Sequence, residues 1–383
     1  MSSASHPKSA LDHVLNDPSA LKPGRIGLLT HSAAVTADLS RGVDALLAAG
    51  VDVRCLISPE HGYWGTGQAG DGHADGRDHV TGLPVLDAYG KDADGLESLL
   101  DGHRIDQVVI DLQDIGCRFY TYMWSMTDIM TACARLGLPV TVLDRPSPLA
   151  STALGPGLDP GFASFVGRYG VPLRHGARLG EIARIVAECY LENTLELHVI
   201  DAPGADGTAP WVPPSPNMPA LTTVALYPGT GLLEGTTLCE GRGTTRPFEL
   251  FGAPWCGPEV AGALRELDLT GVKVREARFR PTHGTFSGRT LHGAQIHLEA
   301  EPGGGAGAPV LPEGFDPLRI GHAIIATVAS LHPAQPLWRE RAPGRPHFID
   351  LLWGSPALRE GIEEGAGYDE ILAASPAPIG MRR

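Results

Sequence analysis

Short apolar runs alternate with segments of helical pattern over the first two-thirds of the chain, and this alternation constrains the fold more than any other feature. Strands are predicted at residues 25–30, 51–58, 105–112, 139–143 and 195–200, and helices at 40–49, 95–102, 121–136 and 178–191. Strands that are separated by helices pair in parallel, because the chain must cross back over the sheet. The run at 105–112 has a continuous apolar centre, as expected of a strand covered on both faces. The sequence therefore predicts an α/β fold with a mostly parallel, doubly wound sheet.

The pattern changes after a segment rich in proline and glycine at residues 202–219. Shorter elements are expected beyond it, namely strands at 272–279 and 293–298 and helices near 317–331 and 356–363. A chain of 383 residues is long enough for two domains, at roughly 100–200 residues per domain. We expect residues 1–205 to form the larger domain with most of the catalytic loops, and residues 206–383 to form a smaller α+β domain that completes the site.

The charge balance excludes one large class of partner. The formal net charge is −14, and no basic run is longer than the terminal Arg382–Arg383 pair. Nucleic acid is therefore not expected, because binding to its phosphates needs concentrated Lys and Arg. No segment approaches the ~18 apolar residues of a membrane span, and the first residues lack the charged and apolar regions of a signal peptide. The chain is expected to be cytoplasmic.

One glycine-rich segment matches a dinucleotide-binding pattern in its letters but not in its context. Gly65, Gly67 and Gly70 have the spacing G-x-G-x-x-G. This pattern binds a nucleotide where a strand turns tightly into a helix, because the helix N-terminus holds the pyrophosphate. Here six residues separate Ser58 from the first glycine, and a poor helix-forming segment follows. We therefore expect a loop that lines a pocket, and no nucleotide or other cofactor.

A neighbouring stretch is rich in residue types that bind metals. Its members are His61, His73, His79, Asp71, Asp75 and Asp78. The stretch has neither the HExxH pattern nor the Cys/His spacing of zinc sites, so a polar loop and no metal are expected. The chain also lacks a G-x-S-x-G elbow and a P-loop, so a serine hydrolase or an ATPase is not supported.

Polar and charged residues gather directly after the predicted strands. Ser58–Gly62 follows the second strand, residues 111–122 follow the third, and residues 144–145 follow the fourth. In a doubly wound sheet, ligands bind beyond the carboxyl ends of the strands. A structural interpretation stays open for single residues, since Asp111 or Asp114 can cap a helix and pair with Arg118. Residues 144–145 can likewise form an ion pair. The cluster as a whole favours a binding site.

Two later segments combine polar side chains with an unusual backbone. The backbone of one is stiffened by prolines, and that of the other is left accessible to a ligand by glycines. Prolines fix the positions of a tryptophan and an asparagine in residues 211–219, WVPPSPNMP. Glycines surround the charged groups of residues 227–249, so the backbone there can approach a ligand closely. Arg242 and Arg246 can bind a carboxylate with two hydrogen bonds each.

Seven motifs together resemble those of the NamZ-type exo-β-N-acetylmuramidase family. They are SPEHG (58–62), DLQDIGCRFYTY (111–122), LDRPSP (143–148), RHG (174–176), WVPPSPNMP (211–219), YPGTGLLEGT (227–236) and EGRGTTRPFEL (240–250). Their order and spacing are similar to the family's from about Gly27 to the C-terminal region. The resemblance implies a Rossmann-like N-terminal domain with a smaller C-terminal domain. It also implies a hydrolase that removes terminal β-linked N-acetylmuramic acid from the non-reducing end of peptidoglycan fragments.

Glycoside hydrolysis assigns roles to the carboxylates of these motifs. One carboxylic acid protonates the leaving oxygen, and a second group stabilises the oxocarbenium-like transition state or activates water. We expect Glu60 to be the acid, partly desolvated and close to His61. Glu234 is expected to be the second carboxylate, with Glu240 and Asp114 as alternatives.

The remaining motif residues are expected to bind the sugar. The lactyl carboxylate of N-acetylmuramic acid needs a cation, for which Arg242, Arg246 and Arg118 are the candidates. Asn217 is expected to hold the acetamido group. Ring stacking is assigned to Tyr120, Tyr122 and Trp211, and further polar contacts are assigned to Arg145, Arg174 and His175.

Two other functions share these features. A non-catalytic protein that binds cell-wall sugars would keep the aromatic and arginine residues but would need no protonated carboxyl group. A transferase or oxidoreductase of Rossmann type would need a bound nucleotide. Release of sugar from a chromogenic substrate separates the first alternative from a hydrolase, and a nucleotide-dependent rise in melting temperature identifies the second.

Overall fold

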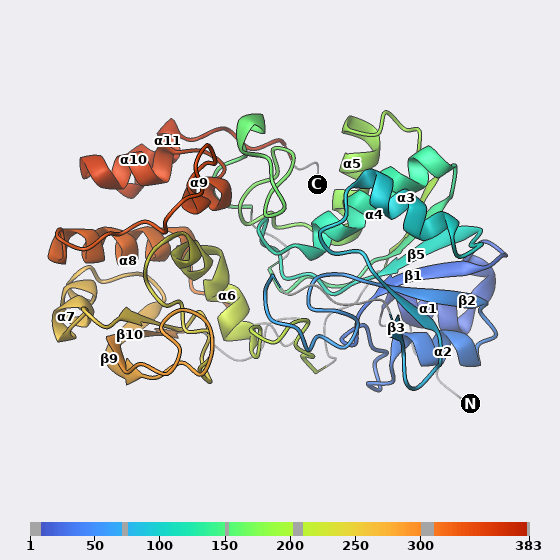
Figure 1. Cartoon of the computed structure of the whole chain (residues 1–383), viewed down its shortest axis with the longest axis horizontal. Coiled ribbons are helices and arrows are strands. Elements are labelled where there is room, and N and C mark those ends of the chain that lie inside the picture. Colours follow the sequence, from blue (N-terminus) through green and yellow to red (C-terminus); the bar gives the residue numbers. More distant parts are fainter. Residues whose placement is uncertain (1–8, 71–75, 150–152, 202–209, 300–309, 381–383) are drawn as a thin grey trace.

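The chain forms two parts that lie side by side, each built around its own sheet (Figure 1). The computed structural model describes residues 9–70, 76–149, 153–201, 210–299 and 310–380. Within these ranges, no helix has the length and apolar character needed to cross a membrane. The larger sheet belongs to the N-terminal part and the smaller one to the C-terminal part.

The larger sheet has seven strands in the order β3-β4-β2-β1-β5-β6-β7. The strands are β1 (Ile26–Thr30), β2 (Val53–Ser58), β3 (Gly76–Arg77), β4 (Pro84–Asp87), β5 (Gln107–Asp111), β6 (Val140–Leu143) and β7 (Leu197–Ile200). All neighbours pair in parallel except β3, which is antiparallel to β4. The chain runs outward from β1 through β2 to β4 and then returns to β5 on the other side of β1. This reversal confirms the doubly wound sheet and places its switch point between β1 and β5.

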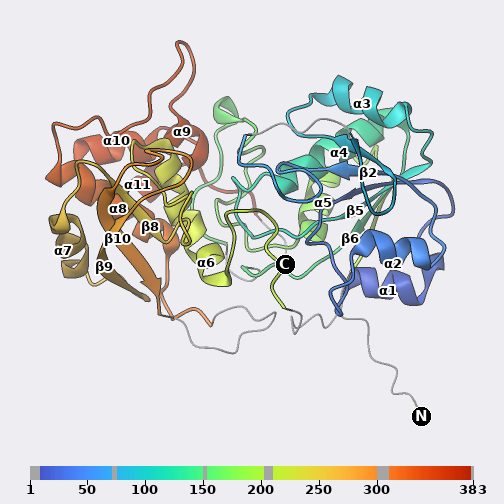
Figure 2. The same ribbon diagram turned by 60° about the horizontal axis from the view of Figure 1, so that its bottom comes forward.

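Helices cover both faces of this sheet (Figures 1 and 2). They are α1 (Ala10–Asn16) and α2 (Gly42–Ala48) on one face, and α3 (Ala93–Asp101), α4 (Tyr122–Leu136) and α5 (Leu179–Cys189) on the other. Successive side chains of β1 point to opposite faces, so Leu28 packs with the first group and Leu29 with the second. All five residues of β1 are buried, which explains the continuous apolar run in the sequence.

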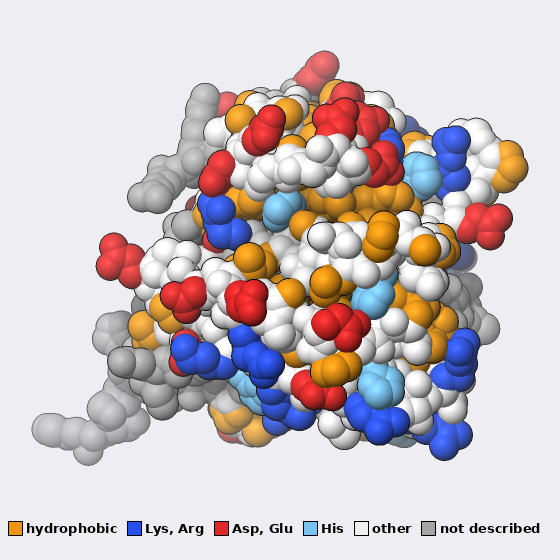
Figure 3. Space-filling model, turned by 90° about the vertical axis from the view of Figure 1, so that its left-hand side faces the viewer, with side chains coloured by type: hydrophobic (Ala, Val, Ile, Leu, Met, Phe, Trp, Pro, Cys, Tyr) orange, Lys and Arg blue, Asp and Glu red, His pale blue; other side chains and the backbone are white. Residues whose placement is uncertain are grey.

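The C-terminal part is a smaller α+β unit, as predicted. Its sheet is antiparallel in the order β8-β10-β9, formed by β8 (Leu250–Ala253), β9 (Val272–Phe279) and β10 (Leu291–Leu298). Its helices are α6 (Leu221–Thr230), α7 (Pro258–Glu266), α8 (Pro317–Leu331), α9 (Phe348–Trp353), α10 (Ala357–Glu364) and α11 (Tyr368–Ala374). A 3-10 turn, η3 (Gly231–Gly235), continues α6. Figure 3 shows acidic side chains gathered at the top of the outer face of this part, where α10 and α11 lie.

Helix α6 was not expected from the sequence, because it contains Pro228 and Gly229. The helix packs directly on α8, and Gly229 is the point of closest approach. A Cβ atom on Gly229 would lie 1.7 Å from the carbonyl oxygen of Pro317. The glycine therefore allows the backbones of the two helices to touch. This contact fixes the end of α6, where η3 begins.

Candidate active site

A cavity of about 210 Å³ lies between the two parts and is lined by residues from both. The N-terminal part contributes Glu60, His61, Ala69, Gly70, Tyr89, Phe119, Tyr120, Thr121, Phe165 and Val166. The remaining lining residues are Ser215, Asn217, Met218, Tyr227, Glu234, Arg242, Phe248, Arg339, Phe348 and Leu352. Six of the residues singled out in the sequence are among them, namely Glu60, His61, Tyr120, Asn217, Glu234 and Arg242.

Glu60 enters the cavity because the chain turns sharply after β2. Pro59 ends the strand, and the backbone then adopts positive φ angles of 73° at His61 and 74° at Gly62. The Glu60 carboxylate is buried and accepts hydrogen bonds from the Gly70 N–H at 2.9 Å and the Thr121 hydroxyl at 2.6 Å. The hydroxyl of Tyr89 also bonds to it. Donors from three separate segments thus fix this carboxylate.

Residues 65–70 of the glycine-rich segment form turns and bends. Its last glycine supplies the N–H that binds Glu60, and Ala69 and Gly70 line the cavity. The end of this segment therefore lines the pocket, as expected from the sequence.

His61 and Tyr120 form the wall next to Glu60. The Nδ1 atom of His61 lies 2.9 Å from the carbonyl oxygen of Gly67, which fixes the orientation of the ring. Burial raises the pKa of Tyr120 well above its usual range, so its phenol stays protonated at neutral pH. Asn217 approaches from the other part of the chain, where its amide nitrogen donates to Gln68 at 3.2 Å.

Glu234 lies on η3 and shares a cation with Glu240. The Arg242 guanidinium is 3.0 Å from the Glu234 carboxylate and 3.1 Å from that of Glu240. Burial raises the pKa of Glu234; Arg242 opposes this rise, while the negative charges of Glu240 and Glu60 add to it. Burial alone would lower the pKa of Arg242, but the two carboxylates raise it. Arg242 is therefore a permanent cation, flanked by two acidic groups.

Arg118 has a structural role in the fold, which its motif did not indicate. Its side chain is completely buried and does not line the cavity. The guanidinium donates hydrogen bonds of 2.6–3.1 Å to five backbone carbonyls, which belong to Pro156, Gly157, Val171, Leu352 and Trp353. Burial lowers its pKa to about 10. Arg118 joins the two parts of the chain and has no geometry for a substrate carboxylate.

Three further predicted residues pair with neighbours away from the cavity lining. Arg145 forms a buried ion pair with Asp111, with Nη2 2.9 Å from the carboxylate. The Nε2 atom of His175 lies 3.1 Å from Asp114, whose carboxylate also accepts the Gly116 N–H. These contacts fix the loops at the carboxyl ends of β5 and β6.

Other predicted residues support the lining from behind or lie outside it. Tyr122 donates its hydroxyl hydrogen to the carbonyl of Pro214 at 2.7 Å, and the indole N–H of Trp211 donates to the carbonyl of Met218 at 3.2 Å. Arg246 is about half exposed and pairs with Glu249 at 3.5 Å. The members of this group that do not line the cavity are Tyr122, Arg174, Trp211, Glu240 and Arg246.

Several lining residues were missed by the sequence analysis. Thr121 lies inside a recognised motif but was not singled out. Tyr89 follows β4, a strand that was not expected, and Phe165 lies outside every motif. Its ring stacks on that of Phe348 with centroids 6.3 Å apart, so an aromatic pair joins the two parts at the cavity.

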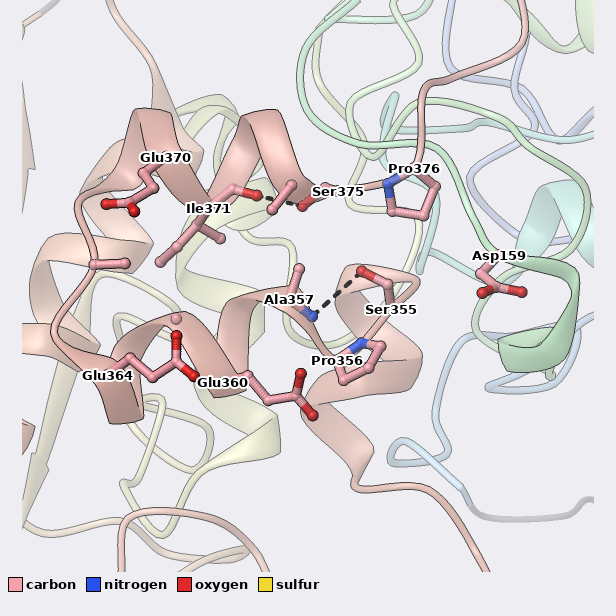
Figure 4. Close-up of a pocket in the computed structure, with 13 residues that line it drawn as sticks. Asp159, Ser355, Pro356, Ala357, Glu360, Glu364, Glu370, Ile371, Ser375 and Pro376 are labelled. Carbon is pink, nitrogen blue, oxygen red and sulfur yellow. Dashed lines mark hydrogen bonds between the residues drawn. The ribbon is translucent and has the colours of Figure 1, made fainter.

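Three larger hollows contain none of the predicted residues. One, of about 430 Å³, is lined by Arg341, Arg345 and Arg359 among others. Another, of about 760 Å³, is lined by α8, α10 and two tryptophans. The third, of about 520 Å³, is lined by Glu360, Glu364 and Glu370, whose side chains lie along one side of it in Figure 4. A concentration of carboxylates would repel an acidic sugar. The smaller cavity between the two parts is the better candidate for the site, because it brings together six of the predicted residues.

The described residues include two histidines and one aspartate from the stretch that is rich in metal-binding residue types. Across all the residues that the structure describes, no group of three or more His, Cys, Asp or Glu side chains is placed to hold a metal ion. His79 instead stacks on Trp64 with centroids 5.0 Å apart. Asp71, His73 and Asp75, which belong to the same stretch, lie outside the described residues.

Comparison with known proteins gives one consistent family. The models for the N-terminal and C-terminal regions of exo-β-N-acetylmuramidase NamZ match residues 26–222 and 225–378. The peptidoglycan β-N-acetylmuramidase NamZ of Bacillus subtilis (strain 168) is 36% identical over 95% of this chain and 86% of its own length.

Solved structures agree with this result. A DUF1343 family protein of Bacteroides fragilis NCTC 9343 is 29% identical, with a TM-score of 0.78 over 95% of this chain and 93% of its own. A second DUF1343 protein of that organism is 27% identical, with a TM-score of 0.69 over 96% and 93%. Both family models and the full-length relative cover nearly all of the sequence, and the chain therefore belongs to the NamZ family of exo-β-N-acetylmuramidases.

Proposed function

We propose that the cavity between the two parts removes terminal β-linked N-acetylmuramic acid from the non-reducing end of peptidoglycan fragments. Membership of the family makes the chain a glycosidase, and the Bacillus subtilis relative is named for activity on peptidoglycan. The observation that carries the proposal is that two carboxylates far apart in the sequence, Glu60 and Glu234, line one cavity. A carboxylate pair of this kind performs glycoside hydrolysis.

Glu234 is the proton donor in this proposal, which reverses the role expected from the sequence. Burial raises its pKa, and Arg242 does not cancel the effect because its charge is shared with Glu240. A carboxyl group with a raised pKa retains its proton closer to neutral pH and can deliver it to the glycosidic oxygen.

Glu60 is the second carboxylate. Its oxygens are fixed by the Gly70 N–H and the Thr121 hydroxyl, so it faces developing positive charge with little reorganisation. Asn217 and Tyr120 supply an amide and an aromatic ring at the same cavity, the groups that bind an acetamido substituent and a sugar face. A volume of about 210 Å³ favours one terminal sugar, since it is below the ~300–1,000 Å³ of typical ligand sites.

Release of the chromophore from a β-linked chromogenic N-acetylmuramide tests the proposal. The wild-type protein should release it, and Glu60→Gln should reduce kcat by about 10²-fold or more. On a natural disaccharide, whose leaving oxygen needs a proton, Glu234→Gln should cause a loss of about the same size. Binding of the sugar by the wild-type protein without release would favour the sugar-binding alternative. Near-normal turnover in both variants would remove the carboxylate pair from the mechanism.

A further inference from the structure

An acidic substrate needs a cation in the cavity that is not already paired with a carboxylate of the protein. Glu60 brings negative charge to the lining, and Arg242 is bound to Glu234 and Glu240. A second arginine, Arg339, also lines the cavity. Its side chain has no ion pair or hydrogen bond with any residue that the structure describes. Among the described lining residues, Arg339 is therefore the guanidinium that is available to a ligand.

The backbone fixes Arg339 relative to the proposed proton donor. Its N–H donates to the carbonyl oxygen of Gly235 at 3.0 Å, and Gly235 follows Glu234 directly. The Thr237 N–H donates to the carbonyl of Leu337 at 2.8 Å, and Trp338 forms an antiparallel bridge with Thr236. The strand-like segment 337–339 is thus paired with the residues that immediately follow η3, so its register is set by the element that carries Glu234.

The side chain of Arg339 lies at the open edge of the cavity. Its guanidinium carbon is 5.9 Å from the centre of the Phe348 ring, which also lines the cavity. Arg339 is exposed, so solvent surrounds its charge when the site is empty. A substrate carboxylate that entered here would form two parallel hydrogen bonds to the planar guanidinium without displacing an existing ion pair.

We propose that Arg339 binds the lactyl carboxylate of N-acetylmuramic acid and so selects this sugar over N-acetylglucosamine. The inference rests on the proposed function, because it assigns a substrate group to the same cavity. It replaces the cations expected from the sequence: Arg118 bonds to backbone carbonyls, and Arg246 pairs with Glu249 outside the lining. Arg242 positions Glu234, and Arg339 recognises the substrate.

The test compares two ligands, of which one carries the charged lactyl carboxylate and the other its neutral methyl ester. Binding of free N-acetylmuramic acid and of its methyl ester is measured by calorimetry with the wild-type protein, Arg339→Ala, Arg339→Lys and Arg341→Ala. Arg341 is the matched control, since it lies two residues away and does not line this cavity. Arg339→Ala should weaken binding of the acid by about 10- to 100-fold and leave the ester nearly unchanged. Arg339→Lys should restore part of the preference for the acid, and Arg341→Ala should behave as wild type.

Kinetics separate recognition from support of the fold. With a chromogenic N-acetylmuramide, Arg339→Ala should raise KM by a similar factor and change kcat little. An equal loss of acid and ester binding would overturn the proposal in favour of a structural role. An equal loss in Arg341→Ala would overturn it in favour of general attraction by surface charge. Failure of the wild-type protein to release the chromophore, with binding of the acid intact, would count against the proposed function and leave the Arg339 result interpretable.

Discussion

The Glu234 carboxylate lies 3.0 Å from one amino group of the Arg242 guanidinium, and the Glu240 carboxylate lies 3.1 Å from the other. Glu234 therefore shares the positive charge of Arg242 with a second carboxylate. If Glu234 donates the proton, Glu234→Gln should lose little activity on a substrate whose leaving group needs no protonation. Turnover of a dinitrophenyl N-acetylmuramide should therefore exceed that of a natural disaccharide by a much larger factor in this variant than in wild type. Glu60→Gln is the control and should be slow on both. The opposite pattern would reverse the two roles, and the same pattern in both variants would contradict the assignment of Glu234 as the proton donor.

The pH dependence of kcat/KM should reflect the raised pKa of Glu234. A general acid must hold its proton, so activity should fall as the pH rises through the pKa of this group. The negative charge of Glu240 contributes to that raised pKa. Glu240→Gln should therefore lower the pKa of Glu234 and move the alkaline limb of the profile to lower pH. A limb that stays in place, or moves to higher pH, would assign it to another group.

The position of Glu60 should depend on Thr121, whose hydroxyl is 2.6 Å from it. Thr121→Val keeps the shape of the side chain and removes this donor. Loss of one fixed donor should lower kcat by about 10-fold, since a net hydrogen bond to a charged group is worth ~1.5–3 kcal/mol. KM should change less, because the hydroxyl acts through Glu60. Thr131→Val is the control, since Thr131 bonds to a backbone carbonyl within α4 and lies outside the cavity lining.

The sequence predicted the large sheet well because its signals are local. The buried strand β1 is a continuous apolar run, and α4 ends at Gly137, which adopts a left-handed φ of 68°. Helix α6 was missed because Pro228 and Gly229 normally mark turns. Here Gly229 is required by the close contact with α8, which is nearly a hundred residues away in sequence. A requirement set by tertiary contact has no local signature.

The same distinction separates the predicted from the unpredicted parts of the site. Glu60 was identified because carboxyl ends of parallel strands meet at one edge of a sheet, a rule that needs no coordinates. Arg118 lies in an equally polar segment, yet its five carbonyl partners come together only in the folded chain. Arg339 joins the cavity through backbone pairing with residues a hundred positions earlier. Neither outcome can be derived from composition or spacing.

The buried guanidinium of Arg118 should be a major determinant of stability. Arg118→Ala would remove a donor from five carbonyl groups, including those of Leu352 and Trp353 in the C-terminal part. Of the five, only that of Pro156 keeps another donor among the described residues, the Leu173 N–H. Buried polar groups without partners cost ~1–3 kcal/mol each, so the free energy of unfolding should fall by at least about 3 kcal/mol. Urea unfolding measures this loss. Arg184→Ala removes an arginine from an exposed ion pair and should change the midpoint little.

The contact between α6 and α8 should tolerate no side chain at Gly229. A Cβ atom there would lie 1.7 Å from the carbonyl oxygen of Pro317, a distance that only movement of a helix can relieve. Gly229→Ala should therefore lower the free energy of unfolding by about 3 kcal/mol or more, and activity should fall with it, since η3 and Glu234 follow α6 directly. Gly262→Ala is the matched control, because Gly262 lies within α7 and a Cβ there meets nothing within 4 Å. That variant should instead gain about 0.5–1 kcal/mol from the better helix propensity of alanine. Equal urea midpoints for the two variants would mean that the helices can separate at this point without cost.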